Sequence, residues 1–176
     1  WAKLWQDYVE DRSKMGRFNY RQVNLSGCGP EMELDLPGNG HHSFVNLTSN
    51  DYLGFTQHHL VKKAAMAGIG KYGAGAGASP AIGGHYRFHR EMEDSIAAFF
   101  RRDSAIVYST GYTANSATLQ ALLKKEDLAI LDMAVHASVY EGCLMTNVKT
   151  FLHNNLEALE RVLRFSEGKY RTRMVI

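Results

Sequence analysis

Residues 1–69 show two helical patterns separated by a strand-like one. Apolar residues at helical spacing predict an amphipathic helix from the N-terminus to near Gly16. Two strands, residues 32–36 and 43–47, are predicted on either side of a hairpin turn at 37–40, PGNG. Apolar positions between 60 and 69 predict a second helix. We therefore expect an N-terminal arm over residues 1–46 and a larger domain over 47–176.

From Phe88 onward, helical and strand-like segments alternate, with short polar connections between them. Strands are predicted at 104–108, 128–131, 149–152 and 174–176. Helices are predicted around 92–99, at 113–123, at 139–145, and from a cap at Asn155 to Phe165. Such alternation favours an α/β fold with a mainly parallel sheet and helices on its faces. Because the last strand opens at the end of the sequence, we expect only the first half of the domain here.

Composition narrows the class of protein. With 45% hydrophobic and 22% charged residues in 176, the chain has the composition of a soluble globular protein. Its net charge of +2 is scattered, which argues against a nucleic-acid partner. Cys28 and Cys143 suggest no disulfide framework, so we expect a reducing, cytoplasmic location. No apolar run approaches the roughly 20 residues of a membrane span.

The glycine-rich run between Tyr72 and Glu93, YGAGAGASPAIGGHYRFHREME, needs backbone freedom or close contact with a ligand or partner. A Walker phosphate loop is excluded because the run contains no lysine. A dinucleotide fingerprint is disfavoured, since the run follows a helical pattern rather than a strand. A flexible surface connection remains an alternative.

Two consecutive predicted strand ends carry polar chemistry. Ser109-Thr110-Gly111-Tyr112 starts a helix, where a phosphate can bind free N–H groups, although a simple helix cap is the alternative. His136 follows the strand that ends at Asp132, at the edge where open α/β sheets bind ligands. Together they suggest one crevice for a planar phosphorylated ligand such as pyridoxal phosphate. The paired histidines elsewhere in the chain have no helix-spaced carboxylate, so we expect no metal site.

Five motifs occur in order along nearly the whole chain. They are SNDYLG (49–54), GAGAGASPAIGG with His89 and Glu93 beyond it, TGYTAN (110–115), DMAVHAS (132–138) and FLHNN (151–155). With these motifs the chain resembles the first half of the α-oxoamine synthases, pyridoxal-phosphate enzymes of the fold-type I, aminotransferase-like class. The resemblance implies that pyridoxal 5'-phosphate is the cofactor.

The resemblance also implies roles for residues on the cofactor side of the site. The cofactor phosphate is expected against the backbone of Gly111 and Tyr112, with Thr110 adjacent. His136 is expected to stack on the pyridine ring as a catalytic residue. Physically, a helix N-terminus neutralises phosphate charge, and an imidazole over the ring fixes its plane.

Other residues are implied to bind substrate or to lie at a dimer interface. Asn50 is expected to face the active site, and Arg21, in preference to Arg17, to bind the substrate carboxylate. The glycine run is expected at the interface of a homodimer, where three of its residues border the acyl-CoA of the neighbouring subunit: Ser79, Ala81 and Ile82. Pro80 replaces an arginine found in many relatives, so the role of that arginine cannot be transferred.

The implied reaction is decarboxylative condensation of an amino acid with an acyl-CoA, which gives an α-oxoamine, CoA and carbon dioxide. In the family, a lysine that binds the cofactor and an aspartate that pairs with its ring lie beyond this sequence, so we expect this chain alone to be inactive. Serine palmitoyltransferase, aminoketobutyrate ligase and 8-amino-7-oxononanoate synthase substrates are all compatible. An aminotransferase or lyase of the same fold, and a non-catalytic accessory subunit, are the alternatives.

Overall fold

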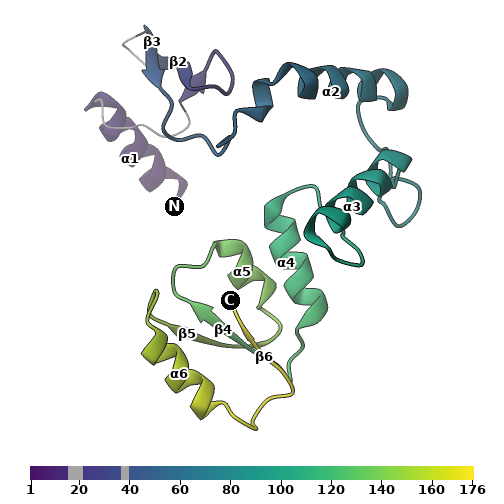
Figure 1. Ribbon diagram of the computed structural model, residues 1–176. Helices are drawn as coiled ribbons and strands as arrows, with labels where there is room; N and C mark the ends of the chain where they lie inside the picture. The colour runs from purple at the N-terminus through teal and green to yellow at the C-terminus, as the bar shows by residue number, and fades with distance from the viewer. Residues whose placement is uncertain (16–21, 37–39) are drawn as a thin grey trace. The chain divides into compact units, whose positions relative to one another are not determined.

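The computed structural model describes residues 1–15, 22–36 and 40–176 (Figure 1). Contacts divide the chain into two compact units, Trp1–Ser79 and Pro80–Ile176. The predicted boundary between arm and domain at residue 46 stays a prediction. Among the described helices, none combines the length and the apolar character needed to cross a bilayer.

Two helices in the first unit match the predicted ones. Helix α1 spans Ala2–Lys14, close to the predicted end, and α2 spans His59–Tyr72, somewhat longer than predicted. The side chain of His58 accepts a hydrogen bond from the backbone N–H of Leu60 at 3.3 Å and so caps α2. The helix ends at Gly73, whose φ of 86° suits glycine. A short 3₁₀ turn, η1 (Phe55–Gln57), was not predicted.

The first unit also contains a three-stranded antiparallel sheet. Its strands are β1 (Val23–Asn24), β2 (Glu31–Leu36) and β3 (Gly40–Val45), in the order β1-β2-β3. The predicted hairpin is confirmed, but its second strand begins at residue 40 rather than 43, because Gly40 already pairs with Leu36. Strand β1 is too short for a periodicity to reveal it. Most of the predicted turn, residues 37–39, lies outside the described residues.

The second unit is an α/β structure, as the alternation predicts. Along the chain it contains α3 (Arg87–Phe100), α4 (Gly111–Leu122), β4 (Leu128–Asp132), α5 (Ala137–Gly142), β5 (Asn147–Phe151), α6 (Leu156–Phe165) and β6 (Arg173–Val175). All pairings in its sheet are parallel, with the order β5-β4-β6. Helix α5 begins two residues earlier than predicted, because the side chain of His136 caps it.

Strand β4 is covered on both faces (Figure 1). Ala129 and Leu131 pack in a cluster with residues of α4 and α5. Leu128 and Ile130, on the opposite face, pack with Phe151 and with the apolar side of α6. All four of these β4 side chains are fully buried. Burial on both faces explains why the strand reads as a continuous apolar run rather than an alternating one.

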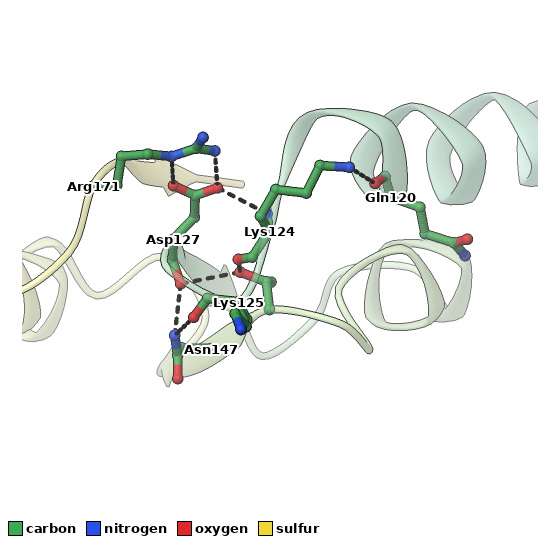
Figure 2. Close-up of polar contacts among 7 residues, drawn as sticks. Gln120, Lys124, Lys125, Asp127, Asn147 and Arg171 are labelled. Carbon is green, nitrogen blue, oxygen red and sulfur yellow. Dashed lines mark hydrogen bonds and ion pairs between the residues drawn. The ribbon is translucent and has the colours of Figure 1, made fainter.

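A polar network joins the amino ends of the three parallel strands (Figure 2). Asp127, which directly precedes β4 and is fully buried, accepts two hydrogen bonds from the guanidinium of Arg171, at 2.8 and 2.5 Å. Its backbone carbonyl accepts a hydrogen bond from the side-chain amide of Asn147, the first residue of β5, at 2.9 Å. Arg171 mainly, and then the backbone N–H of Lys124, lower the pKa of Asp127 to about 2.

The prediction of a strand at residues 104–108 is wrong. The segment is irregular, and among the described residues it pairs with no strand. Val107 instead donates its backbone N–H to the carboxylate of Glu93 on α3, at 3.1 Å. Local sequence can favour an extended backbone, but a strand also needs a neighbour for its hydrogen bonds.

Candidate functional site

The carboxyl end of β4 is held by an aspartate that joins two loops. Asp132 accepts hydrogen bonds from the backbone N–H groups of Ala134, at 2.8 Å, and Asn154, at 3.0 Å. The ring nitrogen Nδ1 of His153 lies 2.9 Å from the same carboxylate. The bond from Ala134 contributes most to a lowered pKa of Asp132. This junction fixes the loop that leads to His136.

The N-terminus of α4 lies in the same unit and is open to an anion. Thr110 is its cap, and its hydroxyl oxygen accepts a hydrogen bond from the backbone N–H of Thr113 at 3.0 Å. The N–H groups of Gly111 and Tyr112 make no hydrogen bond within the described part of the chain. A side chain built on Gly111 would meet no atom within 4 Å. An anion can therefore come close to these two N–H donors, at a helix end that carries positive partial charge.

Two aromatic rings meet beside that helix start. The rings of Tyr112 and His136 lie 5.7 Å apart between centroids, at an interplanar angle of 80°. Both side chains are exposed, so a face of the imidazole can receive a planar ligand. A hydrogen bond to Glu141 on α5 is the main reason why the pKa of Tyr112 is raised.

Helices α4 and α5 pack closely, and their packing sets the distance between the two halves of the site. Asn115 on α4 donates from Nδ2 to the hydroxyl oxygen of Ser138 on α5, at 3.0 Å. One turn further along, Gly142 lies against Leu119 and Ser116. A Cβ on Gly142 would stand 3.1 Å from the Cα of Ser116, closer than a relaxed contact allows. The missing side chain therefore permits this helix contact.

These features fit pyridoxal phosphate. Its phosphate needs hydrogen-bond donors and positive potential, which the unpaired N–H groups of Gly111 and Tyr112 and the helix end supply. Its ring needs an apolar or aromatic face, which His136 offers next to Tyr112. The structure thus brings together the four residues predicted to bind the cofactor, Thr110, Gly111, Tyr112 and His136.

The residues predicted to bind substrate are not all described by the structure, so the position of each is given in turn. Asn50 is exposed, and its side-chain oxygen accepts a hydrogen bond from the hydroxyl of Tyr52 at 3.4 Å. Arg21 and its alternative Arg17 lie outside the described residues. The three predicted interface residues are all exposed: Ser79, Ala81 and Ile82. Their roles stay predictions.

Sequence reasoning missed four residues that shape the site. Asn115 and Ser138 stand inside two of the motifs, TGYTAN and DMAVHAS, but received no role. Glu141 and Gly142 lie one helical turn or less beyond the second motif. A search for polar residues on the facing sides of neighbouring helices could have found Asn115. Nothing in the sequence marks Gly142, since close helix packing appears only in three dimensions.

Comparison with known protein families matches residues 42–176 to the family described as aminotransferase class I and II. The matched segment includes α4, β4 and α5, which carry the candidate site. The chain belongs to this family. Membership confirms the predicted fold type, and a solved structure of a relative contains PLP, the cofactor predicted for this chain.

Two sequence relatives carry the same enzyme name. The chain is 36% identical to 8-amino-7-oxononanoate synthase of Thermoanaerobacter pseudethanolicus, over 97% of this chain and 42% of that protein. It is 40% identical to 8-amino-7-oxononanoate synthase 1 of Bacillus subtilis, over 77% of this chain and 35% of that protein. The chain therefore spans less than half the length of these relatives.

Solved structures give a second enzyme name. Serine palmitoyltransferase of Sphingomonas wittichii matches with a TM-score of 0.86 and 28% identity, over 98% of this chain and 43% of that one. A high-resolution structure of SPT with PLP matches with a TM-score of 0.81 and 27% identity, over 98% and 44% of the two chains. Both enzyme names belong to the α-oxoamine synthases, so the resemblance inferred from the five motifs is confirmed.

Proposed function

We propose that the full-length protein containing this chain condenses an amino acid with an acyl-CoA, releasing CoA and carbon dioxide and forming an α-oxoamine. The observation that carries the proposal is the start of α4, where two unpaired N–H groups lie beside the His136 and Tyr112 ring pair. This arrangement suits a phosphorylated planar cofactor, and the relatives named above catalyse reactions of this class.

The chain's own residues have distinct tasks in this proposal. Gly111 and Tyr112 donate their backbone N–H groups to the phosphate, while the hydroxyl of Thr110 stabilises the helix end that presents them. His136 covers one face of the ring, and Tyr112 limits where the imidazole can move. When bound, pyridoxal phosphate accepts electron density from the α-carbon of the amino acid.

We further propose that Asn50 and Arg21 bind the amino acid, with Arg21 pairing with its carboxylate. An arginine suits that task because its guanidinium can bind a carboxylate through two parallel hydrogen bonds. The segment of Ser79, Ala81 and Ile82 is proposed to border the acyl-CoA at a homodimer interface. The exposure of Ile82, at 87%, supports this assignment, because apolar side chains so open to solvent are typical of contact surfaces. Cytoplasmic location stays part of the proposal.

The test is a product assay on the full-length protein with pyridoxal phosphate, a panel of amino acids and a panel of acyl-CoA thioesters. We expect CoA and carbon dioxide to appear in equal amounts, with a product whose mass equals that of the expected α-oxoamine. The product 8-amino-7-oxononanoate is the first to examine, because the sequence relatives carry that name. Transfer of an amino group to an oxo acid without CoA release would contradict the proposal and favour an aminotransferase.

A second experiment tests the dimer. An Ile82→Asp variant and a His136→Ala variant are each expected to lose most activity, for different reasons. The first should reduce the dimer fraction measured by sedimentation, because it places a carboxylate at the proposed interface. The second should remain dimeric, since His136 lies in the cofactor crevice. Loss of activity in Ile82→Asp without any change in sedimentation would contradict the interface assignment.

A further inference from the structure

A buried hydroxyl connects α4 to the imidazole of His136. Ser138 is completely buried, and its Oγ lies 2.8 Å from His136 Nδ1 and 3.0 Å from Asn115 Nδ2. The backbone N–H of Ser138 also points at His136 Nδ1, at 3.2 Å. The proposed function gives no task to Asn115 or Ser138, although Ser138 contacts the imidazole and Asn115 contacts Ser138.

The direction of each hydrogen bond follows from the chemistry of the donors. A backbone N–H can only donate, so His136 Nδ1 must accept from Ser138. The amide nitrogen of Asn115 also only donates, so the hydroxyl oxygen of Ser138 accepts there and keeps its own proton for Nδ1. Two donors thus converge on Nδ1. In the neutral ring the proton must then sit on the other nitrogen, Nε2.

We propose that Asn115 and Ser138 are positioning residues that hold His136 in the Nε2-protonated form and fix the plane of its ring. The inference rests on the proposed function, in which that ring lies against the cofactor. Without the two donors the imidazole could rotate and exchange tautomers, because it is otherwise exposed. With them, its orientation is set by the packing of α4 against α5.

Replacing Asn115 with Asp, which has nearly the same shape, reverses the direction of the hydrogen bond between this side chain and the hydroxyl of Ser138. Asp in place of Asn115 accepts a hydrogen bond from the hydroxyl of Ser138 instead of donating one to it. The hydroxyl oxygen then presents a lone pair to His136 Nδ1, which favours a proton there. Gln120→Glu is the matched control, since it makes the same change from amide to carboxylate at an exposed position of α4 with no contact to Ser138. Both sites are exposed, so both variants should fold.

The readout is the protonation state of the two His136 ring nitrogens, measured by nitrogen-15 NMR on full-length protein without cofactor. We expect the unsubstituted protein and Gln120→Glu to show Nε2 protonated and Nδ1 unprotonated. In Asn115→Asp the Nδ1-protonated form should gain population. A protonated Nδ1 in the unsubstituted protein, or equal shifts in Asn115→Asp and Gln120→Glu, would overturn the inference.

Cofactor affinity separates this inference from the proposed function. We expect Asn115→Asp to weaken pyridoxal phosphate binding by up to about tenfold, the equivalent of one hydrogen bond, and Gln120→Glu to leave it unchanged. If the tautomer changes as expected but affinity does not, the positioning role stands. The contact between His136 and the cofactor in the proposed function is then wrong.

Discussion

Gly142 lies so close to Leu119 that a Cβ built on the glycine would stand 2.8 Å from the Cβ of the leucine. Real Cβ atoms do not approach so closely, and Leu119 is itself buried in the core. The contact is therefore possible only for glycine. Since α4 carries the N–H groups proposed to bind the phosphate and α5 follows His136, this glycine sets the width of the proposed crevice.

We predict that Gly142→Ala destabilises the protein by about 1–3 kcal/mol, the usual cost of overpacking a filled core. It should also weaken cofactor binding, because α4 must move away from α5. The measurement is urea unfolding followed by cofactor titration. Gly70→Ala is the control, since Gly70 lies within α2 with no atom within 4 Å of a built Cβ and alanine favours a helix. Equal stability of Gly142→Ala and the unsubstituted protein would show that the helices can separate freely.

Asp127 should make stability depend on pH at the acid end. Its pKa is lowered from 3.8 to about 2 in the folded protein, mainly by Arg171. The folded state thus holds this proton less tightly than the unfolded chain does, so the stabilising contribution is fully present above pH 3.8 and is lost as the pH falls toward 2. We expect the urea midpoint to fall over that interval, and to fall less in Asp127→Asn.

A matched substitution serves as the control for the Asp127 experiment. Asp94 forms an exposed ion pair with Arg90 four residues earlier on α3. Because such exposed pairs contribute little, Asp94→Asn should leave both the midpoint and its acid dependence close to those of the unsubstituted protein. A pH profile for Asp127→Asn identical to that of Asp94→Asn would contradict the role assigned to the buried carboxylate.

The start of α4 can be tested by covering its N–H groups. A side chain on the first helical residue leans toward the helix N-terminus, over the place proposed for the phosphate. We predict that Gly111→Val weakens binding of pyridoxal phosphate at least about tenfold, which corresponds to about 1.4 kcal/mol. The melting temperature without cofactor should change little, because the added atoms meet no neighbour. Unchanged affinity for pyridoxal phosphate would show that the phosphate does not bind at Gly111.

Tyr112 should titrate at unusually high pH. Its pKa is raised above 10.0, chiefly by the hydrogen bond to Glu141, so the folded state holds the phenolic proton more tightly than the unfolded chain. This contribution to stability is present below pH 10.0 and is lost as the pH rises through the folded value. The measurement is the difference in tyrosinate absorbance between the protein and Tyr112→Phe. In Glu141→Gln the titration should begin at lower pH.

The sequence predicted a helix or strand correctly where the residues of that element alone determine its structure. The apolar run of β4 identified a strand buried on both faces, and Asn155 identified the start of α6 because its side chain caps the helix. The prediction failed at residues 104–108, where the outcome depends on a partner strand. In the candidate site, the motifs predicted roles for His136 and the turn at Thr110, and these roles stay predictions. The support from Asn115 and Glu141 depends on how two helices face each other.

The Asp127 network has a consequence for how this protein can change. It secures the three parallel strands at their amino ends, whereas His136 and the loop after Asp132 follow the carboxyl end of β4. The contacts that stabilise the sheet and the residues of the proposed ligand site thus lie at opposite ends of one small sheet. Variation in the loops proposed to meet the ligand can therefore accumulate without loosening the sheet. An engineer or natural selection thus has room to alter specificity while keeping the scaffold intact.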